Sequence, residues 1–143
     1  MKQKEYNTYF DFACRVALNS YAERKKVGSC LITPDEVLLI GWNGSPSNFD
    51  NKCEDDQGNT FSHILHSESN AIMKATKAGI SLKGSTIFTT LSPCQSCSNL
   101  IVQAGITKVV YGEVYRDTSP LEFLKKCNVE VEQFKGEQNV HQS

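Results

Sequence analysis

Residues 85–105 read STIFTTLSPCQSCSNLIVQAG and set the fold class of the chain. Ser85–Leu91, which is rich in β-branched residues, is predicted to form a strand. Ser92–Gln95 then match a capping box with proline at the first helical position, which predicts that a helix occupies the rest of the stretch. A second strand is predicted over Lys108–Val114. Because a helix connects the two strands, they are expected to lie parallel in one sheet.

The same alternation extends in both directions from this stretch. The other predicted elements are a helix over Tyr6–Glu23, a hairpin of strands Val27–Ile32 and Val37–Trp42, a helix from Ser62 or His66 to Ala78, a helix over Ser119–Cys127 and a strand over Val129–Phe134. This order predicts the α/β class: a single three-layer α-β-α domain with a five-strand mixed sheet. The domain is expected to span residues 1–135, followed by a polar C-terminal tail over 136–143.

Composition narrows the class of function. The chain has 143 residues, 39% hydrophobic and 22% charged, which is typical of a globular domain. Fifteen Lys and Arg against 16 Asp and Glu give a formal charge of −1. Polynucleotide-binding proteins usually carry a basic excess, so no nucleic acid polymer is expected as a partner. Neither an apolar run of about 20 residues nor a secretory signal is visible, so we expect no membrane partner and a cytoplasmic location.

Six cysteines suggest either three disulfides or chemistry at the thiols. Without a secretory signal, a Cys-x-x-Cys spacing favours metal or redox chemistry. Cys14, Cys30 and Cys127 lie on apolar stripes and are expected to be buried. Cys53 and His63, in a polar loop, suggest a second structural zinc, but a closed zinc site requires four ligands. One zinc ion per chain is therefore expected.

Three residues are candidate metal ligands: His66, Cys94 and Cys97. The two thiols are three residues apart in the first turn of a helix, so they share one face, and a helix amino end favours thiolates. One imidazole and two thiolates leave a fourth tetrahedral position open, as in a catalytic zinc site. Glu68, two residues after His66, is the candidate catalytic carboxylate for proton transfer. The alternative is a redox dithiol with an unrelated histidine.

These residues form a known signature. His66-Ser67-Glu68 followed by Pro93-Cys94-Gln95-Ser96-Cys97 matches H-x-E…P-C-x-x-C, the pattern of zinc nucleobase deaminases. From about residue 6 to residue 134 the chain resembles the cytidine and deoxycytidylate deaminase superfamily, and within it the deoxycytidylate (dCMP) deaminases, especially short phage or viral forms. The segments that carry this closer resemblance are Val27-Gly28, Gly41–Pro46, Leu91–Cys94 and Gln103–Ile106. The chain departs from the usual motif at Trp42, where tyrosine is common, and at Ser67 and Ser69, where alanine and leucine are common.

The resemblance implies a reaction and a set of residues. It implies hydrolytic deamination of dCMP to dUMP and ammonia by zinc-activated water, with Glu68 moving the protons, to supply dUMP for thymidylate synthesis. Substrate would be bound by Asn43, Ser92, Tyr115 and Arg116. The phosphate contact stays open among Arg24, Lys25, Lys26 and Arg116.

The resemblance also implies regulation and assembly. It implies a homohexamer, in the host cytoplasm for a viral protein, that dCTP activates and dTTP inhibits. Effector contacts would come from Gly41, Asn43 and Gly44. Two other functions stay open: deamination of another substrate (dCTP, CMP, cytidine or tRNA adenosine), and a non-catalytic zinc-stabilised nucleotide-binding module. The near-neutral charge argues against tRNA, and Glu68 argues against a module without chemistry.

Overall fold

The computed structural model describes residues 1–136, and its elements follow the predicted order. They are α1 (Gln3–Ala17), β1 (Gly28–Ile32), β2 (Leu38–Trp42), α2 (Ser67–Ala78), β3 (Thr86–Leu91), α3 (Gln95–Gln103), β4 (Lys108–Glu113), α4 (Ser119–Lys126) and β5 (Glu130–Gln133). The predicted tail, 136–143, lies outside the described residues except for Gly136, and its boundary stays a prediction.

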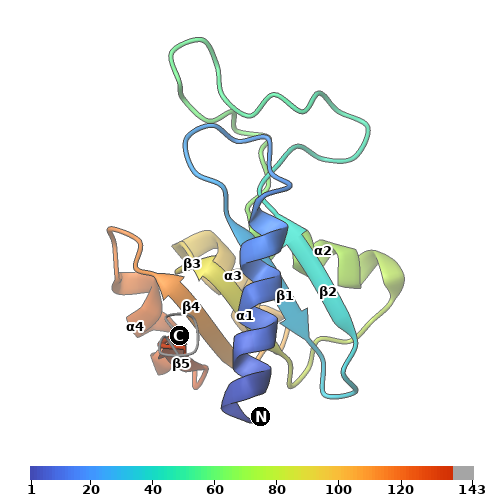
Figure 1. Ribbon diagram of the computed structural model, residues 1–143, viewed down its shortest axis with the longest axis vertical. Helices are drawn as coiled ribbons and strands as arrows, with labels where there is room; N and C mark the ends of the chain where they lie inside the picture. Colours follow the sequence, from blue (N-terminus) through green and yellow to red (C-terminus); the bar gives the residue numbers. More distant parts are fainter. Residues whose placement is uncertain (137–143) are drawn as a thin grey trace, which may run out of the picture.

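The five strands form one mixed sheet in the order β2-β1-β3-β4-β5 (Figure 1). Strand β1 is antiparallel to both β2 and β3, whereas β3, β4 and β5 are parallel. The predicted five-strand mixed sheet is therefore confirmed. Because β1 is antiparallel to β3, Gly28 and Trp42 lie at the same end of the strands as Leu91 and Glu113. Chain segments that bear the candidate site residues leave the sheet at this end.

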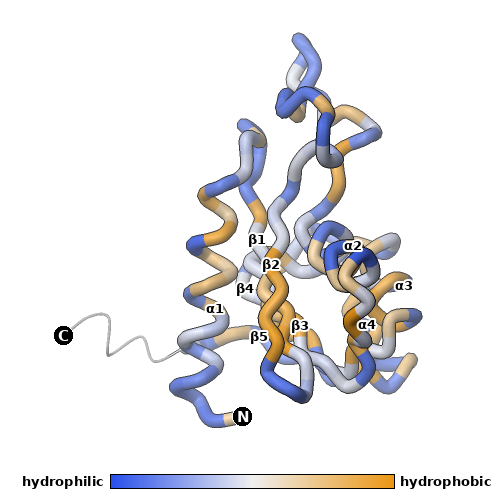
Figure 2. The backbone as a smooth tube through the Cα atoms, turned by 90° about the vertical axis from the view of Figure 1, so that its right-hand side faces the viewer, coloured by the Kyte–Doolittle hydropathy of each residue, from blue (hydrophilic) through white to orange (hydrophobic). Residues whose placement is uncertain are grey.

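Helices cover both faces of the sheet, with α1 on one side and α2, α3 and α4 on the other (Figure 2). Side chains of a strand point alternately to the two faces. Cys30 and Phe88 accordingly pack in the cluster under α1, whereas Leu31 and Ile87 pack in the cluster under α2 and α3. All four side chains are fully buried. Strand β1 is accordingly buried at all five of its residues.

Helix α1 is shorter than predicted: it ends at Ala17, not at Glu23. Leu18 and Tyr21, which the helical pattern assigns to an apolar face, are 60% and 66% exposed. A Cβ added at Gly28 would lie 2.0 Å from the carbonyl oxygen of Ala13, so β1 begins directly against the end of α1. The chain must therefore leave the helix before it can turn back into the sheet. The prediction that Cys14 is buried was also wrong, since it lies on the exposed side of α1.

One helix start also differs from the prediction. Cys94, not Ser92, is the N-cap of α3. The hydroxyl of Ser92 is engaged elsewhere, because it accepts a hydrogen bond of 2.6 Å from the backbone N–H of Tyr115. This long-range contact explains why Ser92 is not the N-cap that the capping-box pattern predicts.

The outer edge of the sheet at β2 is covered by side chains of α2. Lys74 donates to the carbonyl oxygen of Ile40 over 2.9 Å, and Asn70 donates to that of Trp42 over 3.0 Å. The Lys74 ammonium also lies 4.6 Å from the centre of the Trp42 ring. These contacts occupy backbone acceptors that an edge strand otherwise leaves open.

Among residues 1–136, no helix combines the length and the apolar character needed to cross a membrane.

Candidate active site

A pocket of about 310 Å³ lies at the end of the sheet where β1 begins and β3 and β4 end. Its walls come from the four loops α1–β1, β2–α2, β3–α3 and β4–α4 and from the starts of α2 and α3. The predicted site residues that line it are His66, Glu68, Cys94, Asn43, Ser92, Tyr115 and Arg116, together with the phosphate candidates Arg24 and Lys25. The fold therefore brings two candidate metal ligands, the candidate catalytic carboxylate and several cationic side chains into one cavity.

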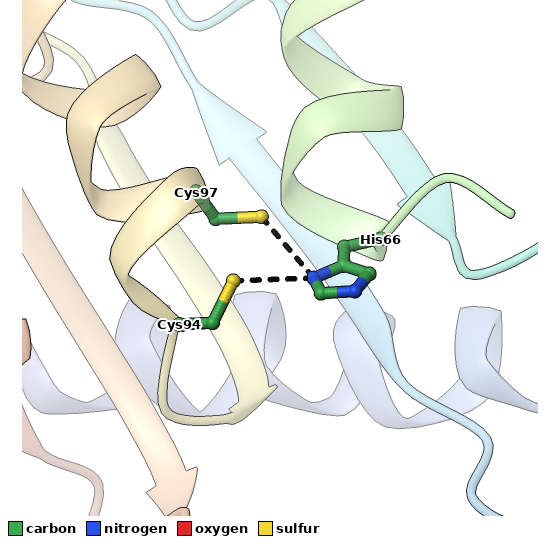
Figure 3. A group of neighbouring side chains, drawn as sticks. All are labelled: His66, Cys94 and Cys97. Carbon is green, nitrogen blue, oxygen red and sulfur yellow. Dashed lines mark hydrogen bonds between the residues drawn. The ribbon is translucent and has the colours of Figure 1, made fainter. Parts of the chain in front are cut away.

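Two helix starts bring the three metal-ligand candidates together. His66 is the N-cap of α2, Cys94 is the N-cap of α3, and Cys97 lies in the first turn of α3. Both sulfur atoms point at the same nitrogen, Nδ1 of His66, at 3.3 Å from Cys94 and 3.5 Å from Cys97 (Figure 3). All three donor atoms lie within 4.8 Å of one another. One nitrogen and two sulfurs at this spacing fit zinc and leave room for a fourth ligand.

The electrostatics of this group favour a bound cation. Hydrogen bonds with Cys97 and then with His66 lower the pKa of the Cys94 thiol far below its usual range. The bond with Cys94, and then burial, raise the pKa of Cys97. The hydrogen bond with Cys94 also raises the pKa of His66. Negative charge is thus placed on Cys94, and a divalent cation would displace the remaining protons of the group.

Glu68 lies beside this group in the first turn of α2 and is only 4% exposed. Burial raises the pKa of its carboxyl, while a hydrogen bond from Ser67 lowers it. The hydroxyl of Ser67 donates to Oε1 of Glu68 over 2.6 Å. A buried carboxylate at the pocket wall, next to a metal-binding group, is placed to take up and release a proton.

Asn43 lines the pocket, but its side-chain amide also bonds to the backbone. Oδ1 accepts from the N–H of Val27 over 2.9 Å, and Nδ2 donates to the carbonyl oxygen of Lys25 over 2.8 Å. The hydroxyl of Ser20 donates to the Asn43 carbonyl oxygen over 2.6 Å. Asn43 therefore holds the segment that carries Lys25 against the pocket.

The cations near the pocket have different partners. Lys25 forms an ion pair of 2.8 Å with Glu113. Arg116 lies over the ring of Tyr115, 5.5 Å from its centre. The side chain of Arg24 forms no ion pair with any of residues 1–136. Lys26 does not line the pocket. Arg24 and Arg116 are thus the cations best placed to meet an anion there.

Of the three predicted effector residues, only Asn43 lines the pocket. Gly41 instead faces α2: an added Cβ would lie 2.3 Å from the carbonyl oxygen of Ser67 and 2.7 Å from the backbone nitrogen of Ala71. Gly44 pairs with Leu65 in an isolated β-bridge, which fixes the chain just before His66.

Cys53 and His63 of the polar loop do not belong to the metal-ligand group, although Cys53 lines the same pocket. Within residues 1–136 all six cysteines are free. The thiol of Cys53 is 3.5 Å from the carbonyl oxygen of Asn51. His63 stacks on Phe61 and meets Phe49 edge-on, with ring centres 5.2 and 4.7 Å apart. In the described part of the chain neither Cys53 nor His63 joins a group of metal ligands.

One buried acidic residue of the pocket was missed by the sequence analysis. Glu54 is 6% exposed and lines the pocket, and its Oε2 accepts the backbone N–H groups of Glu23 and Arg24 over 3.0 and 3.1 Å. It lies in a polar loop without hydrophobic periodicity, so no local pattern marks it as buried. Its partners are 30 and 31 residues away in sequence.

Comparisons with known proteins agree with this site. Residues 3–113 match the family model described as the cytidine and deoxycytidylate deaminase zinc-binding region. A probable deoxycytidylate deaminase of Drosophila melanogaster is 34% identical over 132 residues, which cover 77% of this chain and 62% of that protein. The deoxycytidylate deaminase of Saccharomyces cerevisiae is 30% identical over 145 residues, which cover 94% of this chain and 46% of that protein. The chain thus spans about half to two thirds of the length of these two relatives.

A solved structure is similar over almost its whole length. The crystal structure of dCMP deaminase from the cyanophage S-TIM5, in complex with dCMP and dUMP, superposes with a TM-score of 0.89 and 40% sequence identity. The match covers 94% of this chain and 99% of that one. The family model includes the whole segment from His66 to Cys97, where the three ligand candidates and Glu68 lie. The chain therefore belongs to the cytidine and deoxycytidylate deaminase family, whose cofactor is zinc.

Proposed function

We propose that this protein is a zinc-dependent hydrolase that converts dCMP and water to dUMP and ammonia. The observation that carries the proposal is the placement of Glu68, a buried carboxylate, in the same pocket as His66 and Cys94. Likeness to dCMP deaminases supports the choice of base and sugar, since the cyanophage enzyme was solved with dCMP and dUMP. Together they favour deamination of a deoxycytidine nucleotide over a binding role without chemistry.

His66, Cys94 and Cys97 would hold the zinc ion, which supplies Lewis acidity that makes water a nucleophile at neutral pH. Glu68 would take a proton from that water and deliver it to N3 of the cytosine ring. As the water oxygen bonds to C4, Glu68 would take the second proton from that oxygen and pass it to the exocyclic amine. The bond between C4 and the amine nitrogen then breaks, so ammonia leaves and the C4 carbonyl of dUMP remains. Burial of Glu68 suits this role, because it brings the pKa of a carboxyl closer to neutrality.

The substrate phosphate would lie between Arg24 and Arg116, since both line the pocket. Charge-assisted hydrogen bonds from guanidinium groups to phosphate are strong and directional. Tyr115 would form the wall beside the base and sugar. Ser92 would act by fixing the backbone of Tyr115, and Asn43 by fixing the segment at Lys25.

The proposal also includes the regulation and the assembly of the protein. Activation by dCTP, inhibition by dTTP, a homohexameric assembly and a cytoplasmic location all stay predictions from the family resemblance. The first two are tested by dCMP turnover in the presence of each triphosphate, and the assembly by native mass in solution. Turnover that responds to neither triphosphate would contradict the regulatory part.

The experiment for the reaction is ammonia release by zinc-loaded protein from dCMP, dCTP, CMP and deoxycytidine in parallel. We expect dCMP to be the best substrate. Glu68→Gln should lower kcat at least about 100-fold with zinc content unchanged, because it removes general acid–base catalysis. Glu122→Gln is the matched control, because Glu122 lies on the exposed side of α4. Zinc-loaded protein that binds dCMP without releasing ammonia would support the binding-module alternative instead.

A further inference from the structure

A chain of buried hydroxyl groups connects the sheet to the candidate catalytic carboxylate. The hydroxyl of Ser67 donates to Oε1 of Glu68 over 2.6 Å, and the hydroxyl of Ser29 lies 2.7 Å from that of Ser67. Ser29 and Ser67 are fully buried. Ser29 belongs to β1, an interior strand of the sheet, whereas Ser67 and Glu68 begin α2. The orientation of the carboxylate is therefore tied to the sheet as well as to its own helix.

The number of protons fixes the direction of this hydrogen-bond chain. A serine hydroxyl has a single proton to donate. Ser67 directs its proton at Glu68, so the proton between the two hydroxyls must come from Ser29. Ser29 thus aligns the Ser67 hydroxyl for donation to the carboxylate, and hydrogen bonds in such chains strengthen one another.

The hydrogen bonds from Ser29 through Ser67 to Glu68 also distinguish the two oxygens of the Glu68 carboxylate. Oε1 accepts from Ser67, whereas Oε2 accepts no side-chain hydrogen bond from residues 1–136. Glu68 lines the pocket, so Oε2 is the oxygen left for the proton of the reaction. We propose that Ser67 and Ser29 are positioning residues that fix Oε1 and so present Oε2 to the base. This proposal rests on the proposed deamination reaction.

Burial alone does not explain why these serines are paired. Ser85 and Ser98 are also fully buried, yet within residues 1–136 their hydroxyls have no hydrogen-bond partner. Burial of a serine in this fold therefore does not by itself produce such a pair. Ser67 also stands where the resembling family commonly has alanine, which has no hydroxyl. The Ser29–Ser67 pair therefore supplies Glu68 with a hydrogen bond that alanine at position 67 would not provide.

The test is steady-state kinetics of dCMP deamination with zinc-loaded wild-type protein, Ser67→Ala, Ser29→Ala and the double variant. Ser85→Ala is the matched control, because it removes a buried hydroxyl that makes no hydrogen bond to residues 1–136. We expect Ser67→Ala to lower kcat about tenfold, the scale of one lost hydrogen bond to a charged group, and Ser29→Ala to lower it about threefold, the scale of one lost neutral hydrogen bond. KM and zinc content should stay within about twofold of wild type, and the double variant should match Ser67→Ala because the two changes are coupled.

Each outcome has a separate meaning. Wild-type protein without dCMP turnover would overturn the proposed function. Active wild type with an unchanged kcat in Ser67→Ala would overturn only the positioning role, as would kcat losses that multiply in the double variant. Alanine is a good helix former, so Ser67→Ala is expected to fold. If it does not, Ser29→Ala decides alone: a lower kcat at constant KM supports the proposal, and an unchanged kcat contradicts it.

Discussion

Arg24 and Arg116 approach the pocket from two loops that are far apart in sequence. We expect Arg24→Gln or Arg116→Gln to raise KM for dCMP at least about tenfold, because each removes a charge-assisted hydrogen bond to phosphate. KM for deoxycytidine should not change, since that substrate has no phosphate. The measurement is KM for both substrates in each variant.

Lys26→Gln is the matched control for these arginine variants. Lys26 belongs to the same loop as Arg24 but does not line the pocket. Its variant should keep the wild-type KM for dCMP. An equal rise of KM for dCMP and deoxycytidine in Arg24→Gln would show that Arg24 supports the loop instead of contacting the phosphate.

The cysteines differ in their chemical accessibility. Burial raises the pKa of the Cys30 thiol to about 12, so at pH 8 it is almost entirely protonated and unreactive. Cys14 is exposed, although partial burial, and then Asp11, raise its pKa. We expect iodoacetamide to modify Cys14 in native zinc-loaded protein and to leave Cys30 and Cys53 intact. Peptide mass spectrometry measures this, and modification of Cys30 as fast as Cys14 would contradict the packing under α1.

The metal-ligand group was predictable from sequence, whereas its surroundings were not. Cys94 and Cys97 are one helical turn apart, so local spacing places them on one face. The H-x-E…P-C-x-x-C pattern links them to His66 and Glu68. Ser29 and Ser67 are 38 residues apart and meet only because β1 packs against α2. Glu54 likewise acquires its partners through a loop contact across 30 residues. The residues next to either partner in the sequence give no indication of such contacts.

At the level of elements, the approach of β2 to α2 depends on Gly41. A Cβ at this position would overlap backbone atoms of Ser67 and Ala71, which cannot move without shifting the start of α2. We expect Gly41→Ala to lower the free energy of unfolding by about 1–3 kcal/mol, the usual range for overpacking. It should also weaken zinc binding, because His66 is the N-cap of α2.

Gly44→Ala is the control for this substitution. The nearest atom to an added Cβ at Gly44 is 3.8 Å away, in the ring of Trp42, which is an ordinary contact. Chemical denaturation and zinc titration of the two variants measure the difference. Equal stability of Gly41→Ala and wild type would contradict the close packing of β2 on α2.

Element order was predictable from periodicity, but element ends were set by contacts between elements. The apolar runs of β1 and β2 and the helical spacing in α3 are properties of short segments. The end of α1 is different, because it is determined by where β1 starts, at Gly28 against Ala13. The start of α3 differs from the capping pattern because Ser92 bonds to Tyr115, 23 residues later.

For the molecule as a whole, the metal is expected to contribute to stability. Its candidate ligands come from α2 and α3, so a bound ion would link two helices of one layer. A ligand at 100 times its Kd stabilises a folded protein by about 2.7 kcal/mol. We expect chelation to lower Tm by about 5 °C or more, and added zinc to restore it.

Differential scanning calorimetry with and without a chelator measures this contribution. His66→Ala serves as the control, since its Tm should no longer respond to the chelator. A wild-type Tm that is identical in both conditions would contradict a zinc ion held by these three residues.

The covered edge of β2 has a consequence for how copies of the chain can meet. Lys74 and Asn70 occupy the outward carbonyls of Ile40 and Trp42, so a strand from another molecule would first have to displace them. Growth of the sheet from one molecule into the next is therefore disfavoured at this side, as is the stacking of strands that leads to fibrils. Copies of the chain that meet at β2 would therefore have to do so through side chains instead of through backbone pairing between strands.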